Sequence, residues 1–400
     1  MFGKRVIAIG NKKSILIVNN NMKIGGIQKS LYNLLWTIHD EYRITLLLFE
    51  KCGELLSDLP EDVKVIACKS WFRYLGISQA ETAGDIKDRL LRGGLAALSK
   101  TAGRHVAMQL VLNSQRSLKK EYDCAISFMH NGDIHQFYGG TNEFVLYKTR
   151  AKRKAAFLHC DYEKAGGNSS QNNRQYRKFD RIAACSDGCR REFLKVLPDL
   201  ENRCVTVRNC HRYDVIQKLS ETVPVEYKKD ICNILFVGRL GEEKGADRGI
   251  IAISNAIQKG YPAAFHIVGD GQERKTLEQL TDKLGLKQQV FFYGEQSNPY
   301  RFMKNADLLL VPSYHEAAPM VIDEAVSLGL PVLATKTTST YEMVLQRKAG
   351  WECENSQDGI NRTLLEVLKS SEALENVRSG LNRSKADNVT AIGQFRKLIE

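Results

Sequence analysis

Short apolar runs alternate with amphipathic helical patterns along most of this chain. In the first half, runs of strand length occupy residues 14–19, 43–49, 63–66, 122–128, 154–159, 181–186 and 205–209. In the second half they start at residue 233 and recur at 265–271, 307–313 and 330–335. Strands that alternate with helices predict an α/β fold with parallel sheets, whose ligands bind at the carboxyl ends of the strands.

One segment, residues 69–120, interrupts this alternation. It opens on an aromatic and basic cluster at residues 71–74 and continues with helical stretches such as residues 86–92. Aromatic residues beside lysine and arginine on amphipathic helices are typical of segments that lie on a membrane surface. A solvated helical excursion that packs on its own domain explains the pattern equally well, so both interpretations stay open.

The stretch from residue 233 to residue 245 predicts an anion site. Its apolar run stops at Gly238, and two cations, Arg239 and Lys244, follow just ahead of a helical pattern. A helix N-terminus offers unpaired N–H groups and a positive dipole, and glycine lets the backbone approach a ligand closely. Gly25 and Gly26 occupy the same strand-to-helix position in the first half, where an ordinary tight turn is the alternative.

Two glutamates, Glu316 and Glu324, follow the run at 307–313. Pro319 fits the first turn of a helix, so Glu316 is expected on the loop before that helix and Glu324 inside it. Paired carboxylates can form a glycosidase site, with one on each side of the scissile bond. Placement on one loop and its own helix instead favours two parts of one long ligand, a sugar hydroxyl for Glu316 and a ribose diol for Glu324.

These motifs occur in an order and at spacings that resemble the family 4 glycosyltransferases. The resemblance rests on Arg239, the Glu243-Lys244-Gly245 run, the Val-Gly-Asp-Gly turn at 268–271, the Glu-x7-Glu pair and the Gly-Gly segment at 25–31. It implies a retaining enzyme that moves a sugar from a nucleotide-diphosphate donor, with a UDP-sugar favoured over a GDP-sugar. The implied acceptor is a hydroxyl of a glycan or a polyprenyl-diphosphate-linked glycan in cell-surface polysaccharide biosynthesis. The sequence departs from the family at Ala317-Ala318 and at 337–342, where glycine or proline is common.

The resemblance also implies the GT-B architecture, two Rossmann-like doubly wound domains that face each other across a cleft, with a terminal helix that crosses back to the first domain. Asn209 matches the asparagine that ends the family's first sheet. The expected divisions are an acceptor-binding domain at 1–218 with its helical excursion at about 69–120, a polar linker at 219–230, a donor domain at 231–375 and a C-terminal helix at 376–400.

The family motifs carry over to named residues of this sequence. The implied donor-binding set is Gly25, Gly26, Gly238, Arg239, Lys244, Gly269, Gly294, Glu316, Ala317, Ala318, Pro319, Met320, Val321 and Glu324. The implied catalytic residues are His159, Glu316, Arg239 and Lys244. His159 follows the run at 154–158, so it is expected at the carboxyl end of a strand. Asp161, Arg153 and Lys154 are the acceptor-binding candidates.

No metal or cofactor is expected. The sequence contains no Asp-x-Asp, the paired-carboxylate pattern that chelates a metal in the other main glycosyltransferase fold. Side-chain cations are therefore expected to stabilise the leaving diphosphate in place of Mg²⁺. The nucleotide sugar itself is a substrate. Cys185 and Cys189 with His211 match no zinc spacing, and ten cysteines without a Cys-x-x-Cys pair predict reduced, mostly buried thiols.

The formal net charge of +12 belongs to the first half of the chain. Residues 1–215 hold 35 Lys and Arg against 22 Asp and Glu, whereas the rest hold 23 against 24. Such asymmetry indicates an anionic partner, and an anionic membrane surface or a polyprenyl diphosphate is expected. No nucleic-acid reader motif accompanies the charge, so nucleic acid is not expected as a partner. A nucleic-acid-binding protein and a two-domain binding protein without catalysis remain the rival classes.

The apolar runs are too short to span a membrane. No run of about 18 apolar residues exists, so no transmembrane helix is expected. The first ten residues hold too short an apolar stretch for a signal peptide. The chain is therefore expected in the cytoplasm, peripherally bound to the inner face of the cell membrane.

Overall fold

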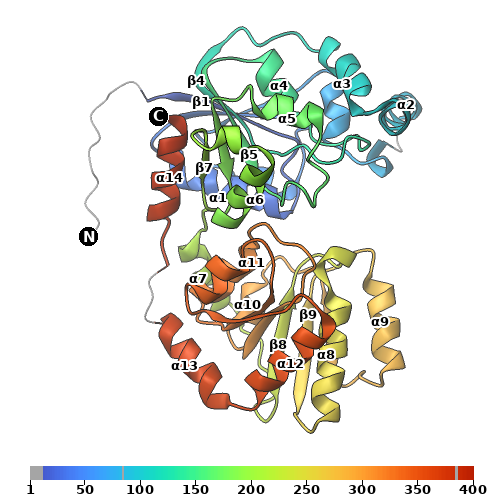
Figure 1. The fold of residues 1–400 in the computed structure, drawn as a ribbon, viewed down its shortest axis with the longest axis vertical. Coiled ribbons are helices and arrows are strands. Elements are labelled where there is room, and N and C mark those ends of the chain that lie inside the picture. Colours follow the sequence, from blue (N-terminus) through green and yellow to red (C-terminus); the bar gives the residue numbers. More distant parts are fainter. Residues whose placement is uncertain (1–11, 83–84, 383–385) are drawn as a thin grey trace. The chain divides into compact units, whose positions relative to one another are not determined.

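The computed structural model describes residues 12–82, 85–382 and 386–400 (Figure 1). The chain divides into two compact units. Unit 1 comprises residues 1–210 and 389–400, and unit 2 comprises His211–Asn388. The first ten residues, on which the signal-peptide expectation rests, lie outside the described part.

Unit 1 is built on a seven-stranded parallel sheet in the order β3-β2-β1-β4-β5-β6-β7. The strands are β1 (Ser14–Asn19), β2 (Arg43–Leu48), β3 (Lys64–Ala67), β4 (Glu121–Ser127), β5 (Arg150–Leu158), β6 (Arg181–Ala184) and β7 (Cys204–Thr206). The helices are α1 (Gly26–Ile38), α2 (Ile86–Ala102), α3 (Arg104–Asn113), α4 (Thr141–Lys148), α5 (Ser170–Tyr176), α6 (Asp187–Val196) and α14 (Val389–Ile399). The strand order reverses between β1 and β4, which places the ligand crevice of a doubly wound sheet at their carboxyl ends.

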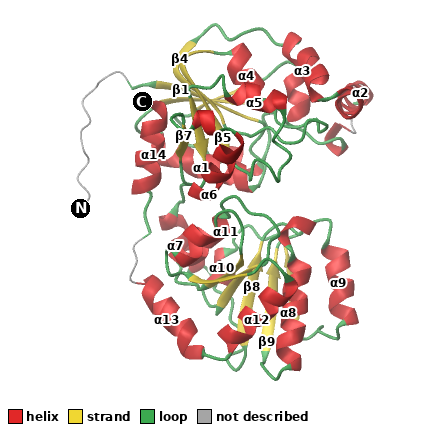
Figure 2. Ribbon diagram, in the orientation of Figure 1, coloured by secondary structure: helices red, strands yellow, loops and turns green. Residues whose placement is uncertain are grey.

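The C-terminal residues return to unit 1. Helix α14 contacts β5, β6 and β7 (Figures 1 and 2), and its Phe395 and Leu398 are fully buried in the apolar cluster that also contains Leu31 and Leu35 of α1. The expected single helix at 376–400 is wrong, because α13 (Ser371–Asn382) ends first and belongs to unit 2. Asn388, just before α14, instead exchanges hydrogen bonds of 2.9 and 2.8 Å with the backbone of His211.

The segment between β3 and β4 is helical, with α2 and α3 in place of a strand. It is tied to α4 and to the loop before α4 through Arg104, a buried residue at the start of α3. The Arg104 guanidinium donates to the buried Glu143 carboxylate of α4, with Nη2 to Oε2 at 3.2 Å, and to the Tyr138 carbonyl at 2.8 Å. An ion pair therefore anchors the excursion inside the unit.

Unit 2 is built on a six-stranded parallel sheet in the order β10-β9-β8-β11-β12-β13. The strands are β8 (Cys232–Val237), β9 (Ala263–Val268), β10 (Val290–Gly294), β11 (Leu308–Val311), β12 (Val332–Thr335) and β13 (Gly350–Cys353). The helices are α7 (Tyr213–Ser220), α8 (Ala246–Gln258), α9 (Arg274–Lys283), α10 (Tyr300–Met303), α11 (Met320–Ser327), α12 (Gln357–Leu368) and α13. Helices cover both faces, so the buried strand β11 is apolar throughout and β9 is apolar except for His266 (Figure 2).

The division between the units falls at residue 210 rather than at 218. The expected linker at 219–230 is also wrong, because this segment is fastened to unit 2. The Val225 amide donates to the Arg301 carbonyl at 3.0 Å, and the Tyr227 hydroxyl donates to the Phe302 carbonyl at 2.9 Å. Polar composition and Pro224 therefore mark a surface loop of unit 2.

All ten cysteines are free, and eight of them are buried. Cys185 and Cys189 lie with their sulfurs 3.9 Å apart in unit 1, whereas His211 begins unit 2. Within residues 12–82, 85–382 and 386–400, no helix is both long enough and apolar enough to span a bilayer.

Candidate functional site

The carboxyl ends of β8 and β11 form the switch point of the unit 2 sheet. These two parallel strands are neighbours, with β9 beyond β8 and β12 beyond β11. The loop at 238–245 follows β8 and the loop at 312–319 follows β11. Sheet topology thus brings together two motifs that lie about 70 residues apart in the chain.

Lys244 and Glu316 meet at this switch point. The Lys244 Nζ donates to Glu316 Oε1 at 2.7 Å, and the Ser313 hydroxyl donates to the same oxygen at 2.8 Å. The Glu316 side chain is 10% exposed and that of Lys244 is 29% exposed. Partial burial strengthens this charge-assisted contact. A cation and a carboxylate therefore lie side by side at the switch point.

The two loops also touch through their backbones at Gly245. Its φ is +63°, and a Cβ at this position would lie 2.4 Å from the Pro312 carbonyl oxygen. Helix α8 begins at the next residue, and no side chain caps its N-terminus. Its first N–H groups can therefore bind an anion beside Lys244.

Arg239 is not brought to the same place. Its side chain is 75% exposed, and Nη2 donates to Glu243 Oε1 at 2.6 Å. In the described residues it makes no ion pair or hydrogen bond with Glu316. Arg239 and Lys244 were expected to meet at one site, but their side chains contact different glutamates. The partner of Arg239, Glu243, is the neighbour of Lys244 in the short helical turn at Glu242–Lys244.

Glu324 is the fifth residue of α11 and is 3% exposed. Pro319 is the N-cap of this helix rather than a residue of its first turn, and no side chain caps the helix N-terminus. The neighbours of Pro319 in the implied donor set serve the core, because Met320 is buried and Ala318 and Val321 pack against the same apolar cluster. Ala317 is half-buried on the loop.

Among the glycines at the ends of β8, β9 and β10, Gly269 is explained by backbone packing. Gly269 has a φ of +140°, and a Cβ there would lie 1.9 Å from the Gly238 carbonyl oxygen. Gly269 and Gly294 also form an isolated bridge. The protein's own backbone therefore requires glycine at position 269, whether or not a ligand approaches.

Gly25 and Gly26 differ from these. Gly25 is the N-cap of α1 without a side-chain cap, and its extended φ of −178° suits any residue. A Cβ on Gly26 would meet no atom within 4 Å. Open space beside an uncapped helix N-terminus at the end of β1 gives unit 1 its own place for an anion.

His159 directly follows β5, as predicted. Its ring stacks on Phe157 with centroids 5.4 Å apart and contacts Phe128 at 4.8 Å. The ring Nε2 is buried and has no hydrogen-bond partner among the described residues. Burial, with a smaller contribution from His130, lowers the pKa of His159 to about 3, so the ring is neutral at physiological pH.

The acceptor candidates on β5 do not share the position of His159. Arg153 and Lys154 precede His159 by five or six residues, which is roughly 16–20 Å along a strand. The Lys154 Nζ donates to the Leu146 carbonyl at 2.7 Å. Asp161 is buried and accepts from the Lys164 amide at 3.3 Å, a local turn contact. Arg153 and Lys154 therefore lie away from His159, toward the amino end of β5.

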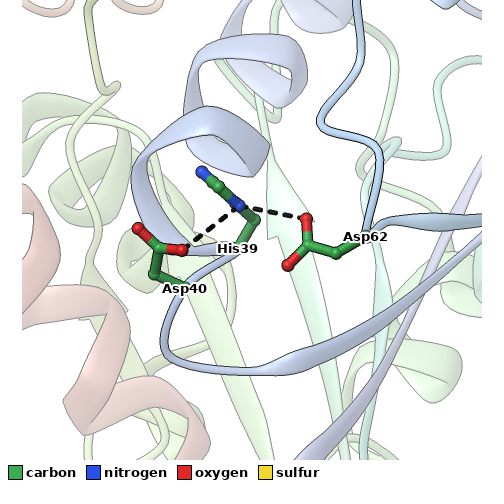
Figure 3. Close-up of side chains that lie close together, drawn as sticks. All are labelled: His39, Asp40 and Asp62. Carbon is green, nitrogen blue, oxygen red and sulfur yellow. Dashed lines mark hydrogen bonds and ion pairs between the residues drawn. The ribbon is translucent and has the colours of Figure 1, made fainter. Parts of the chain in front are cut away.

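One three-residue group among the described residues brings metal-ligand types together, namely His39, Asp40 and Asp62 (Figure 3). Both carboxylates approach the same ring nitrogen, His39 Nδ1, at 3.6 and 3.0 Å. The group lies where α1 ends and β3 is about to begin, at the amino edge of the sheet. Its geometry is that of a histidine paired with two surface carboxylates, away from the carboxyl ends where ligands bind.

Sequence reasoning missed Ser313, whose hydroxyl orients Glu316. The signal was present, because a serine three residues before a glutamate is the spacing at which the two side chains cooperate in capping boxes. It also missed the buried Arg248 of α8, because a lone arginine in a helical pattern resembles a surface residue.

Comparison with known proteins places this site in a recognised domain. Residues 224–380 match the family model Glycosyl transferases group 1. An uncharacterized glycosyltransferase of Methanocaldococcus jannaschii is 34% identical over 140 residues, which is 34% of this chain and 34% of that protein. The lipopolysaccharide glucosyltransferase WaaG of Escherichia coli is 33% identical over 141 residues, 34% of this chain and 37% of that one. The matches thus span about a third of the length of these curated relatives.

The likeness in structure extends over the whole chain. The crystal structure of HepE from Anabaena in complex with UDP and glucose superposes with a TM-score of 0.68 at 18% identity, covering 96% of this chain and 98% of that one. The structure of WaaG gives a TM-score of 0.59 at 18% identity, covering 95% and 98%. The fold is therefore that of the GT-B proteins, with two parallel-sheet α/β units. Within unit 2, residues 224–380 are similar to the group 1 glycosyl transferases.

Proposed function

We propose that this protein is a retaining glycosyltransferase. It moves a sugar from a nucleotide-diphosphate donor, a UDP-sugar in preference to a GDP-sugar, to a hydroxyl of a glycan or lipid-linked acceptor in cell-surface polysaccharide biosynthesis. The match of residues 224–380 to group 1 glycosyltransferases supports the reaction class. The similarity to HepE, a protein crystallised with UDP and glucose, supports the uracil base.

The contact that carries the proposal is Lys244 with Glu316 at the switch point, beside the uncapped N-terminus of α8. The leaving diphosphate gains negative charge as the sugar bond breaks, so a fixed ammonium and helix N–H groups aimed there lower the barrier. Glu316 accepts hydrogen bonds from sugar hydroxyls, and Glu324 accepts them from the ribose. In this proposal Lys244 supplies the positive charge that a divalent cation supplies elsewhere, and transfer needs no added metal.

A thermal-shift panel followed by turnover measurements tests this function. UDP or a UDP-sugar is expected to raise the melting temperature, because ligand at 100 times its dissociation constant stabilises by about 2.7 kcal/mol. Release of UDP with radiolabelled donors, with and without glycan acceptors, then separates an enzyme from a binding protein. Retention is read from the anomeric configuration of the product. Tight, salt-dependent DNA binding without any nucleotide-sugar turnover would support the nucleic-acid rival instead.

His159 is proposed to contact the transferring sugar as a neutral hydrogen-bonding group. His159→Asn is expected to lower kcat by about tenfold to a hundredfold, since one hydrogen bond to the reacting sugar is lost. Because the pKa of His159 is lowered to about 3, its ring does not titrate between pH 5 and 8. The shape of the wild-type kcat profile in this range should therefore persist in the variant. An inflection near pH 6.5 that disappears in His159→Asn contradicts the neutral role.

We also propose that unit 1 binds peripherally to an anionic membrane through α2. Ile86 and Leu90 lie one helical turn apart and are 76% and 70% exposed. Lys87 and Arg89 are exposed on the same helix. Apolar side chains that enter the interface next to cations are the features that hold amphipathic helices on anionic bilayers.

Sedimentation with vesicles tests the membrane contact. The double variant Ile86→Ser, Leu90→Ser is expected to bind phosphatidylglycerol vesicles about tenfold or more weakly, because each apolar side chain contributes up to about 1.5–3 kcal/mol on leaving water. Vesicles of phosphatidylcholine alone should bind the wild type poorly. Val223→Ser, which removes an equally exposed apolar side chain from unit 2, is the matched control. Equal binding by the double variant and this control would exclude α2 as the contact.

A further inference from the structure

Arg248 is a buried cation without a carboxylate partner. It is the third residue of α8 and is 3% exposed. No Asp or Glu of the described residues forms an ion pair with it. Burial of an unpaired charge is costly, arginine stays protonated, and a cation in the first turn of a helix opposes the helix dipole. Ion pairing and the helix dipole therefore give no reason for an arginine here.

The guanidinium instead holds the loop that follows β11. Its Nη1 donates to the Pro312 carbonyl at 3.0 Å and to Asn355 Oδ1 at 2.8 Å. Its Cζ lies over the Tyr314 ring, 4.5 Å from the centroid. A rigid, planar group that binds a carbonyl and stacks on a ring fixes both position and orientation, which a lysine cannot do.

The neighbouring carbonyls of the same loop are fixed as well. The Thr335 hydroxyl donates to the Ser313 carbonyl at 2.6 Å, and the Asn355 amide donates to the Tyr314 carbonyl at 3.0 Å. Asn355 thus links Arg248 to the loop from a second side. The residue so oriented, Ser313, donates to Glu316, which in turn accepts from Lys244.

We propose that Arg248 is a positioning residue for sugar transfer, which sets the loop at 312–316 so that Glu316 faces the transferring sugar. This inference rests on the proposed function. It assigns no contact with the donor to Arg248. Arg248 affects the rate through the orientation of Glu316. Displacement of a reacting group by about 1 Å lowers the rate about a hundredfold.

The test separates charge from geometry. Arg248→Lys keeps the cation but loses the fork and the stacked plane, so kcat is expected to fall tenfold to a hundredfold. The dissociation constant for UDP, which lacks the transferring sugar that contacts Glu316, should change less than about threefold, since the charge is kept. Arg362→Lys, an exposed arginine on α12 of the same unit, is the control and should leave both constants unchanged.

A second variant guards against simple unfolding. Asn355 is exposed, so Asn355→Ala should fold. This variant is expected to lower kcat by a smaller factor than Arg248→Lys, without weakening the binding of UDP. Wild-type kcat in a folded Arg248→Lys, or in Asn355→Ala, would overturn the positioning role, as would a parallel loss of UDP binding and kcat. If the wild type itself neither binds UDP nor transfers sugar, the proposed function fails, and that outcome is distinct from failure of this inference.

Discussion

Lys244→Ala is expected to lower kcat/KM for sugar transfer by about a hundredfold to a thousandfold, or about 2.7–4 kcal/mol, the effect of removing one donor aimed at developing charge. Lys244 is the only cation that the described side-chain contacts bring to Glu316, since Arg239 pairs with Glu243 instead. The loss should fall mainly on kcat, because the leaving diphosphate carries more charge in the transition state than in the bound donor. Steady-state kinetics with a saturating acceptor measure it.

The matched control for this variant is Lys259→Ala. Lys259 is exposed at the C-cap of α8, the end opposite Lys244, and should leave kcat/KM at the wild-type value. Lys244→Arg keeps the charge and should recover part of the rate. Thermal melts of all three variants exclude unfolding. Wild-type kcat/KM in a folded Lys244→Ala would remove the diphosphate role of this residue.

The fold was readable from the sequence where strands are buried on both faces. Central strands such as β1, β9 and β11 are mostly apolar, because helices cover both sides of each sheet. Strands β10 and β13 were not predicted. They are the edges of the unit 2 sheet, they are only partly buried, and β13 carries a tryptophan and a glutamate in four residues.

The division between the units was not readable from composition. Polar residues and Pro224 suggested a linker at 219–230. The segment is instead held in unit 2 by hydrogen bonds to residues of α10, about 75 positions later in the chain. The true crossing at residue 210 lies in the stretch 208–214, which is polar but contains no proline or glycine. Its neighbour His211 is buried and pairs with Asp323 of α11 at 3.2 Å.

The sequence predicted Lys244 and Glu316 of the candidate site, but not the buried Arg248, which holds the loop before Glu316. Lys244 and Glu316 were found because motif spacing and strand ends place them at one sheet edge, where they do meet. Arg239 was expected beside them because it lies near in sequence, yet its long side chain remains in solvent with Glu243. Arg248 could not be found, since burial of an arginine is decided by tertiary packing that leaves no mark on local hydrophobic periodicity.

The second large effect is expected from the buried pair of Arg104 and Glu143 in unit 1. Arg104→Met leaves the Glu143 carboxylate buried without its cation, although the neutral Gln175 and Asn131 still donate to it. Breaking a buried pair by removing one partner costs about 3–5 kcal/mol, which for a unit of this size lowers the melting temperature by roughly 10 °C. Arg177→Met removes a surface arginine that is similarly paired with Asp199 and should melt close to the wild type.

The pH dependence of this loss follows from the pKa of Glu143. Burial alone raises that pKa, but Arg104 and Gln175 outweigh it and hold the pKa below its ordinary value. The pair therefore stabilises the wild type fully above the unfolded pKa of about 4.3, and this contribution disappears as the pH falls through the lowered folded value.

In Arg104→Met the burial of Glu143 dominates its pKa, so protonation of the carboxyl group in acid relieves the destabilisation of the variant. The difference in melting temperature should be largest at neutral pH, begin to shrink as the pH falls through the raised pKa of Glu143 in the variant, and level off below the lowered pKa of the wild type. The double variant Arg104→Met, Glu143→Met should regain much of the stability at neutral pH, because no unpaired charge remains. A neutral-pH melting temperature for Arg104→Met equal to that of Arg177→Met would show that the buried pair does not anchor the α2–α3 segment.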